Sequence, residues 1–133
     1  MTYMLDTNIC IYIIRKKPTL VLEKFKAAKD SGIVISSITL AELLYGISKS
    51  SFPERNKLHL NQFLSFIDIV DYGYTSARHY GQIRTDLETK GQVIGPLDML
   101  IASHALALDL TLVTNNLKEF QRVPSLKLEN WCD

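Results

Sequence analysis

The sequence contains little of what marks a secreted, membrane-bound or disulfide-rich protein. Its 133 residues include only two cysteines, Cys10 and Cys132. Neither belongs to a C-x-x-C pair or stands at zinc-finger spacing from a histidine, so we expect two reduced thiols and no disulfide framework. No apolar run approaches the ~18 residues of a transmembrane helix, and no signal peptide is visible. These absences predict a cytoplasmic protein without a membrane segment.

An excess of charge of one sign is also missing. Fifteen Lys and Arg residues against 14 Asp and Glu residues give a formal net charge of +1. A protein of this balance that binds nucleic acid must concentrate its positive charge locally. The hydrophobic content of 47% and the charged content of 22% are those of an ordinary globular protein. The length fits a single domain over residues 1–133, without an internal repeat or linker.

Short apolar runs alternate with helical patterns along the chain. The runs at residues 3–5, 33–35, 67–70 and 111–113 are typical of buried strands. Residues 126–128 form a further candidate for an edge strand. Helical patterns occupy the segments between the runs, where Gly32 is suited to end one helix and Pro53 to begin another. This alternation predicts an α/β fold with a mainly parallel sheet.

Three carboxylates fall where such a fold would bring them together. Asp6 directly follows the first strand, Glu42 lies in the helix after the second, and Asp98 begins the helix before the fourth. Ligand sites of open α/β sheets lie beyond the carboxyl ends of the strands. Asp6 follows a buried strand with no Arg or Lys adjacent in sequence, and a buried carboxylate requires a compensating cation. The oxygen ligands favour Mg²⁺, which also keeps waters, whereas the His and Cys ligands of zinc are missing.

Each acid also has a purely structural explanation. Glu42 completes a capping-box pattern with Thr39, and Glu119 completes one with Asn116. Asp98 in the first turn of a helix is favoured by the helix dipole alone. Asp6 is equally suited to cap the helix that follows it. Taken singly, no acid therefore identifies a catalytic site.

Four sequence blocks considered together are more specific. They are MLDTN at residues 4–8, SSITLAELLYG at 36–46, GPLD at 95–98 and VTNN at 113–116. In order and spacing they resemble the PIN-domain VapC toxins of bacterial toxin–antitoxin pairs, over essentially the whole chain. The resemblance implies a three-layer α/β/α sandwich with a central parallel sheet, and a metal-dependent endoribonuclease. Asp6, Glu42 and Asp98 match the catalytic acids, and Asp6 and Asp98 are the expected ligands of Mg²⁺ or Mn²⁺.

The chain departs from the family pattern at one corner of this site. Many members carry a fourth Asp after the fourth strand, where this sequence has Asn116. We expect Glu119, one helical turn later, to take the place of that acid. Thr7 and Asn116 match polar positions that line the same pocket.

The resemblance also implies partners. The chain is most similar to an enterobacterial-type subgroup associated with cleavage of initiator tRNA in the anticodon loop. Family members form homodimers and are inhibited by a VapB antitoxin, for which the helices around Ile13, Leu44, Tyr45 and Phe52 offer an apolar docking surface. Candidate RNA contacts are Arg84, Lys16 and Lys17, although each also fits an ordinary solvated helix face.

Two other interpretations remain open from the sequence. A phosphohydrolase of the haloacid-dehalogenase type also begins with Asp after its first strand, but it needs a second Asp two positions on, where this chain has Asn8. Alternatively, the missing fourth Asp would fit a catalytically inactive module that only binds RNA or an antitoxin. Cleavage of total tRNA with and without EDTA separates an enzyme from a binding module.

Overall fold

Five parallel strands form the centre of the protein, which we describe over residues 2–133 of a computed structural model. The strands are β1 (Tyr3–Leu5), β2 (Ile33–Ser36), β3 (Asp68–Val70), β4 (Thr111–Val113) and β5 (Leu128–Glu129). Their order in the sheet is β3-β2-β1-β4-β5, and every neighbouring pair is parallel. Strand β1 therefore lies between β2 and β4, at the point where the strand order reverses. In sheets of this kind that point is where ligands bind.

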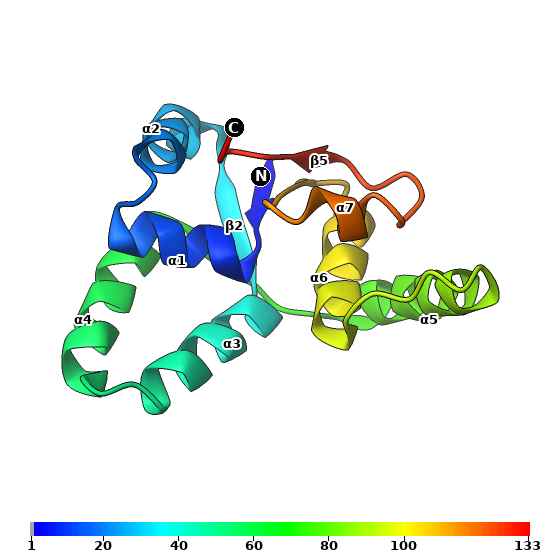
Figure 1. The fold of residues 1–133 in the computed structure, drawn as a ribbon, viewed down its shortest axis with the longest axis horizontal. Helices are drawn as coiled ribbons and strands as arrows, with labels where there is room; N and C mark the ends of the chain where they lie inside the picture. Colours follow the sequence, from blue (N-terminus) through cyan, green and yellow to red (C-terminus); the bar gives the residue numbers. More distant parts are fainter. Residues whose placement is uncertain (1) are drawn as a thin grey trace.

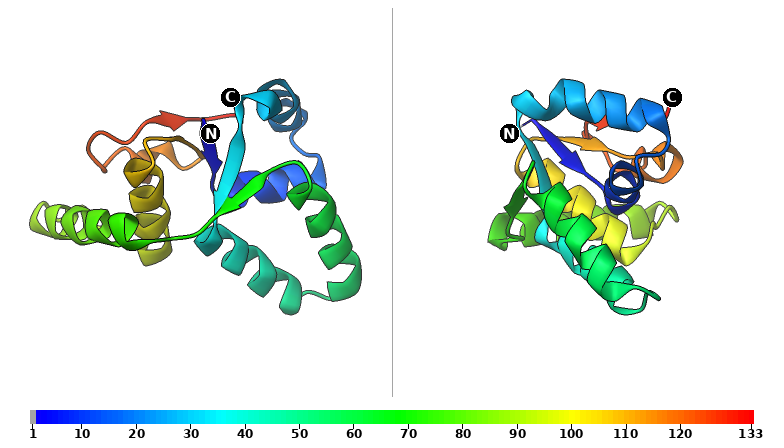
Figure 2. Two further views of the ribbon diagram at one scale, coloured as in Figure 1. Left: turned by 180° about the vertical axis from the view of Figure 1, so that it is seen from behind. Right: turned by 90° about the vertical axis from the view of Figure 1, so that its left-hand side faces the viewer.

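Helices cover both faces of the sheet. They are α1 (Thr7–Arg15), α2 (Thr19–Ala28), the short 3-10 helix η1 (Lys29–Ser31), α3 (Ser37–Ser48), α4 (Pro53–Leu64), α5 (Tyr74–Thr89), α6 (Pro96–Ala107) and α7 (Leu117–Phe120). Helices α1 to α4 lie on one side of the strands and α5 and α6 on the other (Figures 1 and 2). The three-layer α/β/α arrangement expected from the sequence is confirmed.

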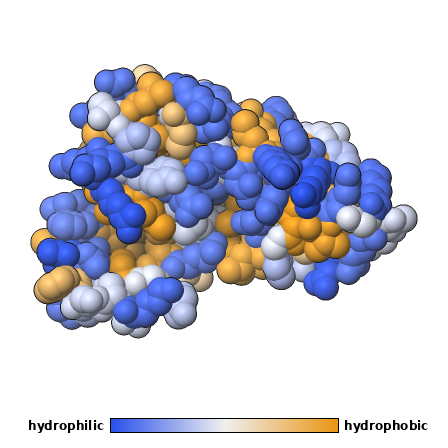
Figure 3. All heavy atoms as spheres, in the orientation of Figure 1, coloured by the Kyte–Doolittle hydropathy of each residue, from blue (hydrophilic) through white to orange (hydrophobic). Residues whose placement is uncertain are grey.

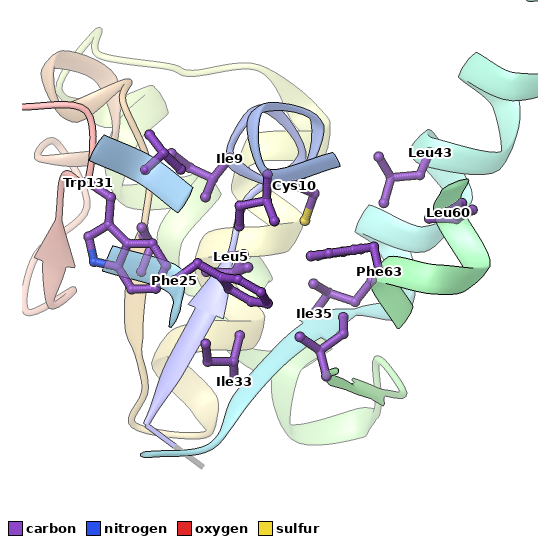
Figure 4. Packing of buried hydrophobic residues seen from close by; sticks show 14 residues of the cluster. Leu5, Ile9, Cys10, Phe25, Ile33, Ile35, Leu43, Leu60, Phe63 and Trp131 are labelled. Atoms are coloured by element: carbon purple, nitrogen blue, oxygen red, sulfur yellow. The ribbon is translucent and has the colours of Figure 1, made fainter. Parts of the chain in front are cut away.

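The side chains of the strands contribute alternately to two separate hydrophobic cores, one on each face of the sheet. Leu5, Ile33 and Ile35 point toward α1, α2 and α4, where Phe25, Phe63 and Trp131 complete the first core (Figure 4). The intervening strand residues contribute to the second core, against α5 and α6: Met4, Val34 and Leu112. Because successive side chains of a strand point to opposite faces, strands that are apolar throughout require a helix layer on each side.

The predicted elements are confirmed with small shifts at their ends. Helix α1 begins at Thr7, directly after Asp6, and the carboxylate of Asp6 caps it as the sequence suggests. Strand β5 does lie at the sheet edge, but it comprises Leu128–Glu129 and not 126–128. Cys10 is buried, Cys132 is partly buried, and both are free thiols. Within residues 2–133, no helix is long and apolar enough to cross a membrane.

Candidate active site

Asp6 is held rigidly at the end of β1. Its Oδ1 accepts a hydrogen bond from the backbone N–H of Ile9 at 2.9 Å, and its Oδ2 accepts one from the hydroxyl of Thr114 at 2.5 Å. Only 6% of the residue is exposed. The capping role considered for Asp6 is therefore real. It leaves lone pairs free on both oxygens, because each carboxylate oxygen accepts about two hydrogen bonds.

Thr114 is a site residue that the sequence did not single out. It is fully buried directly after β4, and its hydroxyl both donates to Asp6 and accepts from the backbone N–H of Asn116 at 3.0 Å. It therefore links the ends of two neighbouring strands. A threonine at the end of a buried strand signals a hydroxyl that needs a partner, but the partner lies 108 positions away in sequence.

Glu42 reaches the same rim from α3. Its Oε1 accepts a hydrogen bond from the hydroxyl of Thr7, the first residue of α1, at 2.8 Å. The capping box predicted with Thr39 is wrong, because α3 begins earlier and is capped by Ser36. Thr39 is buried inside the helix. The carboxylate of Glu42 therefore does not cap α3, and helix capping does not explain why an acid stands at this position.

Asp98 shows that the carboxylates lie near one another. It occupies the first turn of α6, as predicted, and is partly buried. Burial raises its pKa to about 6, and the charges of Asp6, Glu119 and Glu42 add to the shift in that order. Burial also raises the pKa of Asp6, with a contribution from Glu42 and against the two hydrogen bonds that it accepts. Four acids from separate segments therefore repel one another at one rim.

The fourth corner of the site is formed by α7. Asn116 precedes this helix, but its side chain makes no capping hydrogen bond, so the predicted capping box with Glu119 is wrong as well. The charge of Glu119 instead acts on Asp98. The carboxylate of Glu119 is thus close enough to Asp98 for their charges to interact. This is where the family resemblance leads us to expect the substitute for the fourth Asp.

Basic side chains do not neutralise this cluster. The ion pairs formed within residues 2–133 join Arg84 to Glu88, Lys90 to Asp86 and Lys127 to Asp109. In the same part of the chain, no three His, Cys, Asp or Glu side chains form a ready-made metal cage. A closed site of the zinc type does not fit. An ion that binds one or two carboxylates and keeps its waters, as Mg²⁺ does, fits the donor set.

The three predicted RNA contacts are not brought together. Lys17 lines one groove together with Glu42. Lys16 lines a second groove, together with Ile13 and Phe25. Arg84 lies on α5, where it donates to the hydroxyl of Tyr80 at 2.9 Å and pairs with Glu88 at 3.5 Å.

The expected antitoxin surface is only partly available. Ile13 is 5% exposed, whereas Leu44, Tyr45 and Phe52 are 44%, 66% and 58% exposed. Ile13 therefore belongs to the core, and the exposed members of the expected surface lie on α3 and in the turn that follows it.

Known proteins match this chain over nearly their whole length. The PIN domain family model matches residues 3–126. Ribonuclease VapC2 of Rickettsia felis is 54% identical over 132 residues, and the tRNA(fMet)-specific endonuclease VapC of Salmonella typhimurium is 48% identical over 130; each match covers 98% of both chains.

Solved structures agree with these matches. The VapBC2 complex of Rickettsia felis bound to a promoter DNA fragment has a TM-score of 0.94 at 52% identity, covering 98% of this chain and 99% of that one. The DNA-bound VapBC of Salmonella typhimurium has a TM-score of 0.93 at 47% identity, covering 99% of both.

Proposed function

This chain belongs to the PIN-domain family, and we propose that it is the metal-dependent ribonuclease toxin of a toxin–antitoxin pair. The main support for the proposal is that Asp98 lies near three other carboxylates, those of Asp6, Glu42 and Glu119. Burial and these charges raise the pKa of Asp98 to about 6. Such a cluster is costly to the fold unless a bound cation relieves it. Full-length relatives named ribonuclease VapC support RNA as the substrate.

We propose that Asp6 and Asp98 hold Mg²⁺ or Mn²⁺, with Glu42 and Glu119 as direct or water-mediated ligands. A bound ion of this kind supplies a water of lowered pKa and stabilises charge on the phosphate. The other residues position these ligands. Thr114 orients the carboxylate of Asp6, and Thr7 orients that of Glu42. We propose that Asn116 and Thr7 line the same pocket, as the family resemblance implies.

The proposed substrate is a tRNA, with initiator tRNA first among the candidates. Relatives at 48% identity are named tRNA(fMet)-specific endonucleases, and the matches span nearly the whole of both chains. The proposed inhibitor is a cognate VapB antitoxin, because the similar solved structures are VapBC complexes. We further propose a homodimer in the cytoplasm.

Incubation of total tRNA with the purified protein tests the proposal. We expect cleavage in Mg²⁺, loss of cleavage in EDTA, and recovery when Mg²⁺ is restored. Asp6→Asn and Asp98→Asn keep the shape of the site and should each abolish cleavage. Wild-type rates in either variant would refute the mechanism, and absence of cleavage by the wild type would favour a binding module. A phosphoryl group trapped on Asp6 would indicate a phosphohydrolase instead.

Co-expression with a VapB-type antitoxin tests the partner. We expect a small VapB protein to co-purify with the chain and to suppress tRNA cleavage. Light scattering of the toxin alone should give the mass of a dimer. A monomer that binds no such protein would contradict both assignments.

A further inference from the structure

A largely apolar groove that also carries four basic side chains adjoins Glu42. It has a volume of about 820 Å³ and runs between α1, α3 and α4. Glu42 is among the residues that line it, so the groove and the group of acids share this residue. We refer to it as the basic groove, after the charged side chains that line it: Arg15, Lys17, Lys49 and Arg55. Figure 3 shows this region as an apolar hollow bordered by hydrophilic residues.

The four cations are available to a ligand. All four are exposed, and the ion pairs formed within residues 2–133 involve other cations. Glu42 is the one carboxylate that lines the groove. The chain as a whole carries a net charge of only +1. Positive charge is thus concentrated beside the acidic site, which is what nucleic-acid binding requires of a nearly neutral protein.

Two exposed aromatic rings stand beside two of these cations. The ammonium of Lys49 lies 4.7 Å from the ring centre of Tyr45, and the guanidinium of Arg55 lies 4.5 Å from that of Phe52. Tyr45 is 66% exposed and Phe52 is 58% exposed. Each pair offers a ring surface on which a base can stack and a cation for the neighbouring phosphate. This combination is typical of sites that bind single-stranded nucleic acid.

The turn between α3 and α4 is fixed by its own hydrogen bonds. The side-chain amide of Asn56 donates to the hydroxyl of Ser50 at 3.0 Å, and that hydroxyl donates to the carbonyl of Ile47 at 2.7 Å. The backbone N–H of Asn56 donates to the carbonyl of Phe52 at 3.0 Å. The two cation–aromatic pairs therefore lie on either side of a turn that is held by hydrogen bonds. This reduces the conformational entropy that is lost when a ligand binds.

We infer that the basic groove binds single-stranded RNA on its way to the acidic site, with phosphates on the four cations and bases on Tyr45 and Phe52. This inference rests on the proposed function for the choice of RNA. The groove lined by Lys16, Ile13 and Phe25 is a weaker candidate, because none of the four acids lines it. Loop bases of an RNA can be splayed out in this way, whereas paired bases cannot.

Binding of a labelled single-stranded RNA of about 12 nucleotides, a length that one groove of this kind can track, provides the test. Fluorescence anisotropy of the wild-type protein in EDTA measures affinity without cleavage, at several salt concentrations. Lys49→Gln and Arg55→Gln should each reduce the slope of log K against log salt by about 0.7, the value for one phosphate contact on a single strand. Lys57→Gln, on the same helix as Arg55 but outside the groove, is the matched control and should leave the slope unchanged.

The aromatic rings have a distinct signature. Tyr45→Leu and Phe52→Leu should each weaken binding about tenfold, as loss of one stacked base does, without changing the salt slope. Phe66→Leu is the control, because Phe66 is 59% exposed and lines the other groove. Circular dichroism and urea unfolding verify that each variant is folded.

The readouts separate this inference from the proposed function. Failure of the wild type to cleave tRNA would refute the nuclease, but the EDTA binding data would still decide the groove. Salt slopes and affinities equal to those of the wild type in all four variants would overturn the groove inference. If those variants instead weaken only the binding of a co-expressed antitoxin, the groove belongs to the protein partner and the inference is equally overturned.

Discussion

The imidazole Nδ1 of His104 lies 2.8 Å from the hydroxyl oxygen of Ser36, in a fully buried contact. Ser36 caps α3, the helix of Glu42, by accepting from the backbone N–H of Ile38 at 3.0 Å. His104 belongs to α6, the helix of Asp98. One hydrogen bond therefore ties together the two helices that carry two of the four acids.

Ser36→Ala removes the cap of α3 and the partner of His104 at once. We expect the free energy of unfolding to fall by about 2 kcal/mol, because a lost cap costs about 1 kcal/mol and an unpaired buried polar group a similar amount. Urea unfolding measures this difference. Ser48→Ala, at the exposed end of the same helix, should change stability by no more than about 0.5 kcal/mol. Equal effects of the two substitutions would show that the buried contact does not stabilise the protein.

His104 should make the protein less stable in mild acid. Burial lowers the pKa of His104 below its ordinary value of 6.5, although a hydrogen bond with the backbone at Asp71 and the charge of Asp71 act in the opposite direction. The unfolded chain therefore binds the proton more readily, so stability is full above pH 6.5 and falls as the pH drops through that value. Urea unfolding across this range should show the loss in the wild type. His104→Gln should lack that component, and an identical pH profile in both proteins would contradict it.

Asp98→Asn should stabilise the metal-free protein. The pKa of Asp98 in the folded protein, about 6, lies above its ordinary value of 3.8, so the ionised carboxylate opposes folding at neutral pH. We expect the variant to gain about 1 kcal/mol at pH 7 in EDTA, because the partly exposed carboxylate is screened by solvent. The gain should vanish as the pH falls from 6 toward 3.8.

Added Mg²⁺ should reverse that ranking. A ligand that binds only the folded state stabilises it by mass action, so the wild type should gain stability with Mg²⁺ while Asp98→Asn gains little. Urea unfolding of both proteins in EDTA and in Mg²⁺ provides the comparison. Equal gains in the two proteins would exclude Asp98 as a ligand.

Thr114→Val should raise the pKa of Asp6 further. The hydroxyl of Thr114 stabilises the ionised form of Asp6, and its loss should move the acid side of the pH–rate profile of tRNA cleavage to higher pH. Stability at pH 7 should fall by about 2 kcal/mol, the usual loss for a hydrogen bond to a charged group. Thr111→Val, at the other end of β4, is the control of matched shape. A pH–rate profile that coincides with the wild type would refute the role of Thr114.

Glu119→Gln and Asn116→Asp together test whether Glu119 replaces the Asp that the family carries at the position of Asn116. Glu119→Gln should weaken Mn²⁺ binding in calorimetry, because it removes one of the carboxylates around Asp98. Asn116→Asp in that background should restore much of the affinity, since it places a carboxylate at the start of α7, where a helix N-terminus favours it. If Glu119→Gln binds Mn²⁺ as the wild type does, Glu119 does not replace the missing Asp.

The fold was largely predictable because its signals are local. Uniformly apolar strands such as Ile33–Ser36 and a helix opening at Pro53 require no knowledge of distant partners. The ends of elements were less predictable where a side chain decides them. Helix α3, for example, begins at Ser37 because Ser36, and not Thr39, caps it.

The site was predictable in its acids but not in their supports. Asp6 directly follows an apolar strand and Asp98 lies in the first turn of a helix, and both features are visible in the sequence. The family pattern then predicts that the two acids belong to one site. Thr114 and His104 act through partners 108 and 68 positions away, and sequence spacing contains no record of such contacts. The basic groove combines residues of three helices, so its charge is invisible in a net charge of +1.

The position of β1 between β2 and β4 has a consequence for synthesis on the ribosome. A nascent chain that ends before Thr111 already contains Asp6, Glu42 and Asp98, yet it lacks the strand that covers one edge of β1 and the hydroxyl that orients Asp6. The group of acids around Asp98 therefore lacks this support until nearly the whole chain has been synthesised. Asp6 gains the hydroxyl that orients it only after Thr114 has left the exit tunnel.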